Sequence, residues 1–531
     1  MRPRPRLVAV ALIVATASAA CTSDDGGGTS SSSPQYAVGG TYTEPIMQDP
    51  GNLNPLVAQT TTANLVAPFA YDTLINLDQD GTVISQLASS WDATPTSVTF
   101  TLQHGVTCSD GAPLTASDVA ETFAYIKDPK NHSTMIGSRL PSADFSVTSD
   151  DAAGTVTVSV PDPYGFLLQG AGLVPIVCPK GLADDSSLAH DTDGTGPFEL
   201  SEYVADDHLT YTARGDYGWG PDGASTGVAG FPATVVFRVV QNETTAANLL
   251  LSGQLSTAYI GGADRSRLEG QGFQHLDILA GPDDLFFNQR PDHPGADIAV
   301  RRALTQALDL DQLATVATQG TGTRAESLTL IAPTPCSGNT VDDTLPTHDV
   351  DAAGSALDDA GWTLGADGTR TRDGQTLSVT LIYPSGDAGF DAAMELVRQR
   401  WTQLGVDVKL MGQGASAYIQ TLFQGTSWDV AWLSVGTSFP TEFRQFVTGP
   451  PSPKSSNFPA ASNDDYDRLS QRALSTTGQA GCDVWAQADR ALFVNLDVVP
   501  VAATTLAAYS TARYREGLGG PEPTSIRLLE G

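Results

Sequence analysis

The stretch YDTLINLDQDGTVISQLASSWDATPTSVTFTLQHGVTCSDGAPLTASDVAETFAYI, residues 71–126, contains the patterns that decide the fold. Within it, residues 97–106 alternate apolar and polar side chains, as a half-buried strand does. A turn at residues 110–113 follows. Thr115 and Asp118 then stand at capping-box spacing before an apolar helical stripe. This segment therefore predicts a strand, a turn and a capped helix.

The second half of the chain repeats the mixture of strands and helices. Residues 298–310 carry apolar side chains at four-residue spacing behind Asp297, which predicts one capped helix. Residues 390–405 form the clearest amphipathic pattern of the chain. Strand patterns surround that helix, at residues 377–384, 406–412 and 428–436. This order predicts an α/β fold in which some strands pair in parallel.

The first 20 residues have the pattern of a secretory signal, with three arginines before a short apolar run. Cleavage after residues 17–19 would release a soluble protein. Cleavage before Cys21 would leave a lipid-bearing N-terminus. A lipobox normally has Leu where this chain has Ser18, but the Ser/Gly-rich tether at residues 21–35 is typical of an anchored protein. We favour lipidation of Cys21 and a location on the outer face of the cell membrane, or in the periplasm of a host with an outer membrane.

The composition limits the function classes. The chain has 531 residues, which predicts two or three domains, and 40% of them are hydrophobic. The net charge is -32, with 60 acidic residues against 28 lysines and arginines. We do not expect the protein to bind nucleic acid, because contacts with phosphates require basic side chains. The acidic residues are spread along the chain and predict a well-solvated surface.

Four cysteines remain besides Cys21, an even number that predicts disulfides in an exported protein. Three pairings are open. We favour the two pairs that join neighbours in the chain order, Cys108–Cys178 and Cys336–Cys482. None of the four belongs to a C-x-x-C motif, so no zinc site is expected.

No catalytic constellation stands out. The chain has no P-loop and no H-E-x-x-H motif, and its seven histidines are scattered. Pairs of acidic residues are frequent, but any acidic protein offers them by chance. We therefore expect a protein that is not an enzyme and that carries no cofactor and no metal.

Several segments together resemble the extracellular solute-binding proteins of ABC importers, of the dipeptide, oligopeptide and nickel-binding type. Each motif alone has low specificity, but their order along residues 36–520 matches the family. The matching segments are residues 71–126, GTGPFEL (194–200), LFFNQ (285–289), ALDDAGW (356–362) and WDVAWLSVG (428–436).

The resemblance implies a two-lobe periplasmic-binding-protein-like α/β fold with hinge strands. Lobe one would span residues 36–280 in two subdomains, lobe two residues 281–495, and residues 496–531 would return to lobe one. The family implies a monomer that binds a peptide or another small polar solute and presents it to a membrane permease, with membrane contact through the N-terminal lipid. A sensor lipoprotein of the same fold and, last, a secreted hydrolase are the alternatives.

The resemblance also suggests which residues face the ligand. The strand ends that line the cleft in such proteins correspond here to Tyr42, Thr60, Thr61, Asn288, Trp432 and Ser434. Trp432 is the first choice, as an aromatic wall for stacking. Oligopeptide binders carry an aspartate shortly after this tryptophan, whereas here no acid occurs before Glu442. A modified peptide, an oligosaccharide or a siderophore-like compound therefore remains open, and a bare nickel ion is not expected without a histidine cluster.

Overall fold

The structure is a computed structural model that describes residues 35–58, 60–262 and 264–530. The chain divides into two units, residues 1–35 and residues 36–531, and the second unit holds all the elements discussed below. The predicted signal sequence and Cys21 lie outside the described residues.

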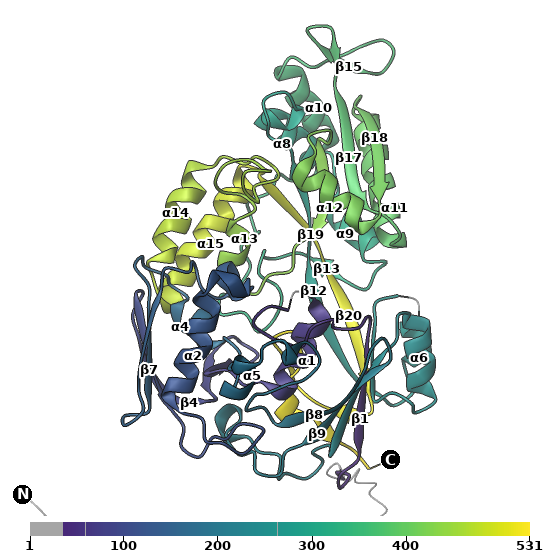
Figure 1. Ribbon diagram of the computed structural model, residues 1–531. Helices are drawn as coiled ribbons and strands as arrows, with labels where there is room; N and C mark the ends of the chain where they lie inside the picture. Colours follow the sequence, from purple (N-terminus) through teal and green to yellow (C-terminus); the bar gives the residue numbers. More distant parts are fainter. Residues whose placement is uncertain (1–34, 59, 263, 531) are drawn as a thin grey trace, which may run out of the picture. The chain divides into compact units, whose positions relative to one another are not determined.

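The largest sheet has seven strands, in the order β11–β20–β12–β19–β17–β18, with β13 beside β20. Figure 1 shows its two long strands, β12 (Gln274–Phe287) and β20 (Val498–Ser510), running side by side. They pair antiparallel, whereas β17 pairs in parallel with both β18 and β19, as the strand–helix–strand order predicts. The other strands are β11 (Thr257–Ile260), β13 (Thr323–Arg324), β17 (Ser378–Pro384), β18 (Asp407–Gln413) and β19 (Val430–Ser434).

The long strands serve two separate cores. Near one end, Val499 and Val501 of β20 pack in a core with Leu285 of β12. Near the other end, Ala507 and Tyr509 of β20 belong to a different core, which contains α6 (Glu243–Leu251) and β11. A third and largest core contains Phe286 of β12 and Val498 of β20, so the two strands connect all three cores.

The ladder between β12 and β20 is irregular at its middle. Its register shifts between Leu279 and Gly281 and again between Asp283 and Asp284. Gly281 has a φ of +131°, which an L side chain rarely adopts, and a Cβ there would lie 3.0 Å from the Cα of Gly436. Bulges bend a strand and increase its twist, so the ladder has a built-in bend at this point.

Two smaller four-stranded sheets lie in the first half of the chain. One has the order β1–β10–β9–β8 and the other β4–β5–β7–β6. The strand predicted at residues 97–106 is β5, with Val98 and Phe100 fully buried. The bounds are β1 (Thr41–Ile46), β4 (Ala88–Ala93), β5 (Ser97–Leu102), β6 (Ser146–Asp150), β7 (Thr155–Ser159), β8 (Phe198–Val204), β9 (His208–Ala213) and β10 (Thr234–Val239).

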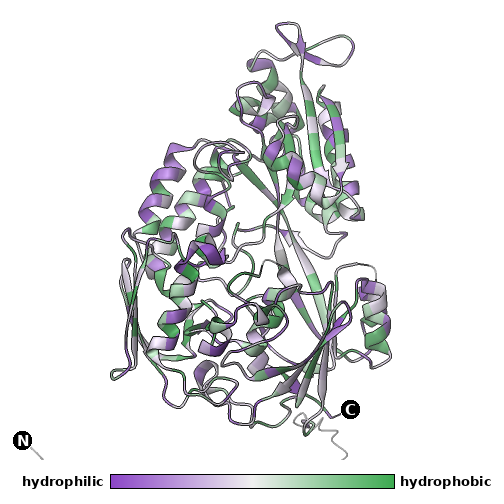
Figure 2. Ribbon diagram, in the orientation of Figure 1, coloured by the Kyte–Doolittle hydropathy of each residue, from purple (hydrophilic) through white to green (hydrophobic). Residues whose placement is uncertain are grey.

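The helices are amphipathic and cover the sheets. In α2 (Ala116–Lys127) the predicted capping box between Thr115 and Asp118 is formed. Figure 2 shows hydrophilic residues along α14, whose buried positions follow a helical stripe. The other long helices are α1 (Thr61–Ala70), α10 (Val350–Asp359), α11 (Ala388–Gln403), α12 (Ala415–Gln424), α14 (Asp464–Leu474) and α15 (Gly478–Val494).

The single helix predicted at residues 298–310 is two helices. α8 (Ile298–Gln306) begins after Asp297 as predicted, but α9 (Leu310–Ala317) starts anew behind Asp309. The Asp309 carboxylate accepts the backbone N–H of Gln312 at 3.0 Å, so it caps a second helix. The four-residue apolar spacing continued across this break and concealed it.

Both favoured disulfides are present. Cys108 bonds to Cys178 and Cys336 bonds to Cys482, over sequence separations of 70 and 146 residues. Each bond joins segments that are distant in sequence, and the second attaches α15 to the loop that precedes α10.

Trp432, the expected stacking wall, lies elsewhere. Its side chain has zero exposure in the core that β12 and β20 share with α11. Its ring meets the edge of Phe390 at 5.8 Å, and its carbonyl accepts the Tyr418 hydroxyl at 2.6 Å. The alternation of β19 turns this residue inward. The Trp432 side chain therefore packs in this core and has no surface for a ligand.

Replacing Trp432 with Ala should therefore lower the free energy of unfolding by about 3–5 kcal/mol, because it removes a fully buried indole. Chemical denaturation of Trp432→Ala beside the unchanged protein measures this difference. A variant of unchanged stability that had lost solute binding would contradict the core assignment.

Removing the bond between Cys336 and Cys482 with a double Ala substitution should lower the free energy of unfolding by about 2–5 kcal/mol. The matched control is the double Ala variant of Cys108 and Cys178. Its loop is about half as long, so its loss should be smaller by about 0.6 kcal/mol. Denaturation curves of the two variants give the order, and a larger loss from the shorter loop would show that chain entropy does not decide it.

Candidate functional site

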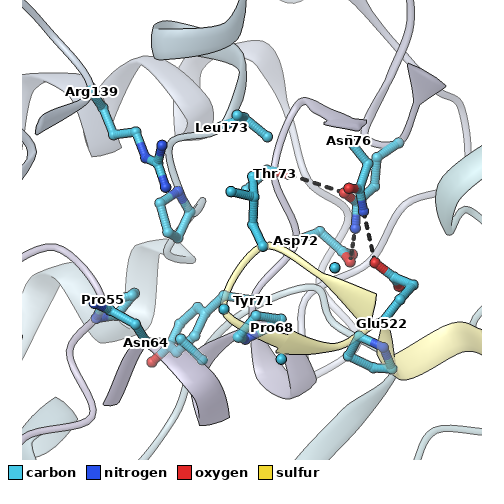
Figure 3. A pocket seen from close by; sticks show the side chains of 18 of the residues that line it. Pro55, Asn64, Pro68, Tyr71, Asp72, Thr73, Asn76, Arg139, Leu173 and Glu522 are labelled. Carbon is cyan, nitrogen blue, oxygen red and sulfur yellow. Dashed lines mark hydrogen bonds between the residues drawn. The ribbon is translucent and has the colours of Figure 1, made fainter. Parts of the chain in front are cut away.

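A cavity of about 660 Å³ lies where segments from residues 55–217 meet the loop after β19 and the C-terminal segment. α1 forms one wall, with Asn64, Ala67 and Pro68. Figure 3 shows the cavity with Arg139 and Leu173 on one side and Asn76 and Glu522 on the other. The remaining wall comes from residues 331 and 436–442 and from residues 517–524.

The buried carboxylate of Asp72 organises the floor of this cavity. It accepts four hydrogen bonds, from Gln86 Nε2 at 2.6 Å and at 3.0 Å each from the Thr195 hydroxyl, the Tyr217 hydroxyl and Trp219 Nε1. Burial raises the pKa of Asp72 to about 7, although these bonds favour the ionised form. Three segments, at residues 86, 195 and 217–219, are thus fixed to one side chain.

Two glycines let one of those segments approach. A Cβ on Gly194 would lie 2.3 Å from the carbonyl oxygen of Ala70, and one on Gly196 would lie 2.5 Å from the Ala70 carbonyl carbon. The segment around Thr195 therefore packs directly on the end of α1, and only glycine permits this contact. The motif GTGPFEL is a packing motif that delivers Thr195 to Asp72.

Arg139 is the cation of the cavity. It is half-buried, and its guanidinium makes no hydrogen bond or ion pair with any residue that the structure describes. A guanidinium offers five donors in a planar fork that matches carboxylates and phosphates. Arg139 is thus able to bind an anionic or strongly accepting group placed in the cavity.

The acids on the cavity wall already have partners. Glu522 accepts the side-chain amide of Asn76 at 3.0 Å. Glu442 accepts the backbone N–H groups of Ser438 and Phe439 at 3.1 and 3.2 Å, and so caps the short helix α13 (Pro440–Arg444). These carboxylates shape the wall, and Arg139 is left as the charged group without a protein partner in the described chain.

Two contacts connect the first half of the chain with loops of the second half. The ring of Phe166, at the start of α4 (Leu167–Gly172), meets the edge of Phe439 at 5.5 Å. The second contact is a close approach of two backbone segments, because a Cβ added to Gly81 would lie 2.2 Å from the carbonyl oxygen of Thr334. These contacts join segments that are distant in sequence, and none of the four residues lines the cavity itself.

The bend in the long strands lies next to the cavity, because Gly436 both touches Gly281 and lines the cavity wall. The Asp283 carboxylate accepts hydrogen bonds from Ser434 and from the Thr504 hydroxyl, and burial raises its pKa to about 6. Ser434, expected to bind ligand, is instead a partner of this carboxylate. The bend is thus held by side-chain bonds across three strands.

The structure does not place the other expected residues on the cavity wall. Asn288 is fully buried and donates to the Trp428 carbonyl at 2.8 Å. Tyr42 is buried in the largest core, and Thr61 is exposed at the first position of α1. Thr60 caps α1 by accepting the Ala63 N–H at 3.1 Å. Among the six residues expected to bind ligand, Thr60 has the most direct link to the cavity, because it caps the helix that carries the lining residue Asn64.

The residues that do line the cavity were missed by sequence reasoning, with Asp72 and Arg139 foremost. Asp72 belongs to residues 71–126, but no pattern in that segment indicates that hydrogen-bond donors from residues 195–219 converge on its carboxylate. Among the residues described, no group of three or more His, Cys, Asp or Glu side chains is placed to hold a metal ion. In the same part of the chain, no helix is both long enough and apolar enough to cross a membrane.

Comparison with known proteins agrees with this architecture. Residues 82–452 match the family described as bacterial extracellular solute-binding proteins, family 5. Protein XP55 of Streptomyces lividans is 29% identical over 364 residues, which are 64% of this chain and 61% of that protein. The nickel-binding periplasmic protein of Escherichia coli K12 is 26% identical over 69% of this chain and 71% of its own.

A solved structure aligns over more of the chain. The substrate-binding protein of Microbacterium hydrocarbonoxydans, in complex with 4-hydroxybenzoate hydrazide, has a TM-score of 0.70 and 27% identity, covering 92% of this chain and 99% of that one. The family match covers well over half of the sequence. The chain therefore belongs to the bacterial extracellular solute-binding proteins of family 5 and has their two-lobe α/β fold.

Proposed function

We propose that this protein captures a small polar solute in the cavity beside Arg139 and delivers it to an ABC importer in the membrane. The observation that carries the proposal is the cavity itself. Its volume of about 660 Å³ lies within the range of small-molecule sites, and one guanidinium faces it without a protein partner in the described residues. Apolar walls with a few polar groups are typical of sites that fix the orientation of a ligand.

The lobes would move about the bend in β12 and β20. We propose lobe one as residues 36–280 and 496–531, and lobe two as residues 281–495, so that both crossings fall in or beside these strands. Closure would bring the loop containing Gly436 and Ser438 over a solute that rests on the lobe-one floor. Exclusion of water would then strengthen the contact between the solute and Arg139.

The cavity favours a compact solute over a long peptide. The Microbacterium neighbour holds 4-hydroxybenzoate hydrazide, an aromatic molecule of a size that this cavity would accommodate. The relative from Escherichia coli binds nickel, but here the described residues lack the imidazole cluster that a bare ion would need. We infer a solute with an anionic or strongly accepting group, such as a small modified peptide or an organic acid.

Native mass spectrometry of the protein purified gently from its own host tests the function directly. A receptor with closed lobes retains its solute, so a discrete added mass is expected, and its identity gives the solute class. A protein that is free of added mass and that shows no thermal stabilisation by a panel of small acids, peptides and sugars would contradict the proposal.

Replacing Arg139 with Gln should weaken binding of the retained solute at least tenfold, about 1.4 kcal/mol, because the charged fork is lost. Isothermal titration with the identified solute measures the affinity. Arg468→Gln is the matched control, since Arg468 is exposed on α14 and pairs with Asp465 three residues away. Equal affinities of the two variants would place the solute away from Arg139.

Anchoring by lipid at Cys21 completes the proposed function, since a receptor works only near its permease. Replacing Cys21 with Ala should move the protein from the membrane fraction to the medium, because one lipid-bearing residue supplies the attachment. Fractionation of cells that express each version measures this. Retention of the Cys21→Ala protein in the membrane fraction would favour a different attachment.

A further inference from the structure

The long connection between β13 and α10 forms part of the wall of the solute cavity. Residues 325–349, which the structure describes throughout, contain no helix and no strand, and we call them the wall loop. A connection of this length without secondary structure is uncommon in a compact domain and usually has a function. Ile331 lines the cavity beside Ser438, and an isolated bridge pairs Thr329 with Thr437. The position of the wall loop therefore shapes the cavity.

Four hydrogen bonds join the wall loop to Thr437 and Ser438, in the segment after β19. The Thr437 hydroxyl donates to the Leu328 carbonyl at 3.0 Å, and the Ser438 hydroxyl donates to the Ile331 carbonyl at 2.9 Å. In the other direction, the Ile331 N–H donates to the Thr437 carbonyl at 3.3 Å. The Thr334 hydroxyl donates to the Ser438 carbonyl at 2.9 Å. The cavity wall at Ser438 is thus held by the wall loop.

A covalent bond fixes the wall loop to a helix. Cys336 is bonded to Cys482, in the first turns of α15. α15 is itself firmly packed, because Trp485 and Leu492 are buried in the largest core. The Thr329 hydroxyl donates to the Cys336 carbonyl at 3.3 Å, so the anchored residue also holds the start of the bonded segment. The disulfide therefore connects the cavity wall to a well-packed helix.

The other disulfide, between Cys108 and Cys178, has no such link to the wall. Among the described residues, the hydrogen bonds of these two cysteines do not reach the wall loop or residues 437–438. Both cysteines are 1% exposed, whereas Cys336 is half-buried. A reductant in solution therefore reaches the bond of Cys336 more readily, and the pair Cys108–Cys178 is an internal control.

We propose that the Cys336–Cys482 disulfide positions the cavity wall, and that opening this bond lowers the affinity for the solute. The second part of this inference rests on the proposed function. A dithiol opens the bond by exchange: the sulfur–sulfur bond breaks, both cysteines become thiols, and the reagent is oxidised to a disulfide. The wall loop would then sample arrangements that lack its bonds to Thr437 and Ser438. The apparent affinity falls with the fraction of protein whose wall is in place.

Hydrogen–deuterium exchange followed by mass spectrometry tests the positioning without any solute. In the Cys336→Ala/Cys482→Ala variant, the amides of residues 328–334 and 436–442 should exchange at least about tenfold faster than in the unchanged protein, because the wall opens locally. The amides of α2 should keep their rates. The Cys108→Ala/Cys178→Ala variant is the matched control and should keep the rates of residues 436–442. Equal acceleration of these residues in both variants, or none in the first, would overturn the proposal.

A second measurement uses the unchanged protein, so it decides the result if the variant does not fold. Dithiothreitol is added in steps to protein that carries the solute retained from its host, and differential alkylation shows which disulfide has opened. In native mass spectra, the fraction of protein with added mass should fall as Cys336–Cys482 opens, before Cys108–Cys178 does. Exchange at residues 436–442 should rise at the same step and return to its first rate after reoxidation.

The two measurements separate this inference from the proposed function. Full retention of the added mass with the Cys336–Cys482 bond open would overturn the effect on affinity. A protein that never carries added mass, but whose residues 436–442 exchange faster when this bond opens, would contradict the proposed function and still support the positioning of the wall by the disulfide.

Discussion

The pairing of β12 with β20 is the constraint on which the rest of the structure depends. β20 contributes to all three cores and β12 to two of them, so the packing on either side depends on the register between these strands. The two register shifts and Gly281 interrupt the ladder where the packing passes from one core to the other. A continuous ladder would be stiff along its whole length, whereas bulges place the bend where few core side chains are strained by it.

The cavity depends on a second constraint, the convergence of donors on Asp72. A buried carboxylate is costly unless several hydrogen bonds satisfy it, so the four donors and the acid stabilise one another's positions. The glycines at 194 and 196 admit the segment that carries one of the donors. The floor is therefore held in one arrangement by these bonds.

Local patterns in the sequence predicted most single elements, because capping, alternation and helical spacing act over few residues. The capping box of α2 and the strand β5 are examples. The split between α8 and α9 was missed because apolar spacing ran across it and Asp309 could equally have been a surface residue. The length of β12 was also missed, since only its last residues have a clear apolar pattern.

The site could not be predicted to the same extent, because it is made by long-range packing. The family resemblance suggested that residues at strand ends face the ligand. In the structure, Trp432 lies in the core and the Ser434 hydroxyl donates a hydrogen bond to Asp283. Asp72 and Arg139 acquire their roles only when segments from residues 64 to 524 meet. The disulfides were predictable by contrast, since chain order alone favoured two of the six available pairs.

The net charge of -32 is compatible with a proposed solute that carries an anionic group. At physiological ionic strength the screening length is about 8 Å, so distant surface acids act only weakly on a group inside the cavity. An anion in the cavity would be attracted by Arg139 at contact distance. The acids on the wall, Glu522 and Glu442, already accept hydrogen bonds from other groups of the protein. An acidic chain can therefore receive an anionic group where short-range geometry, and not its overall charge, decides the interaction.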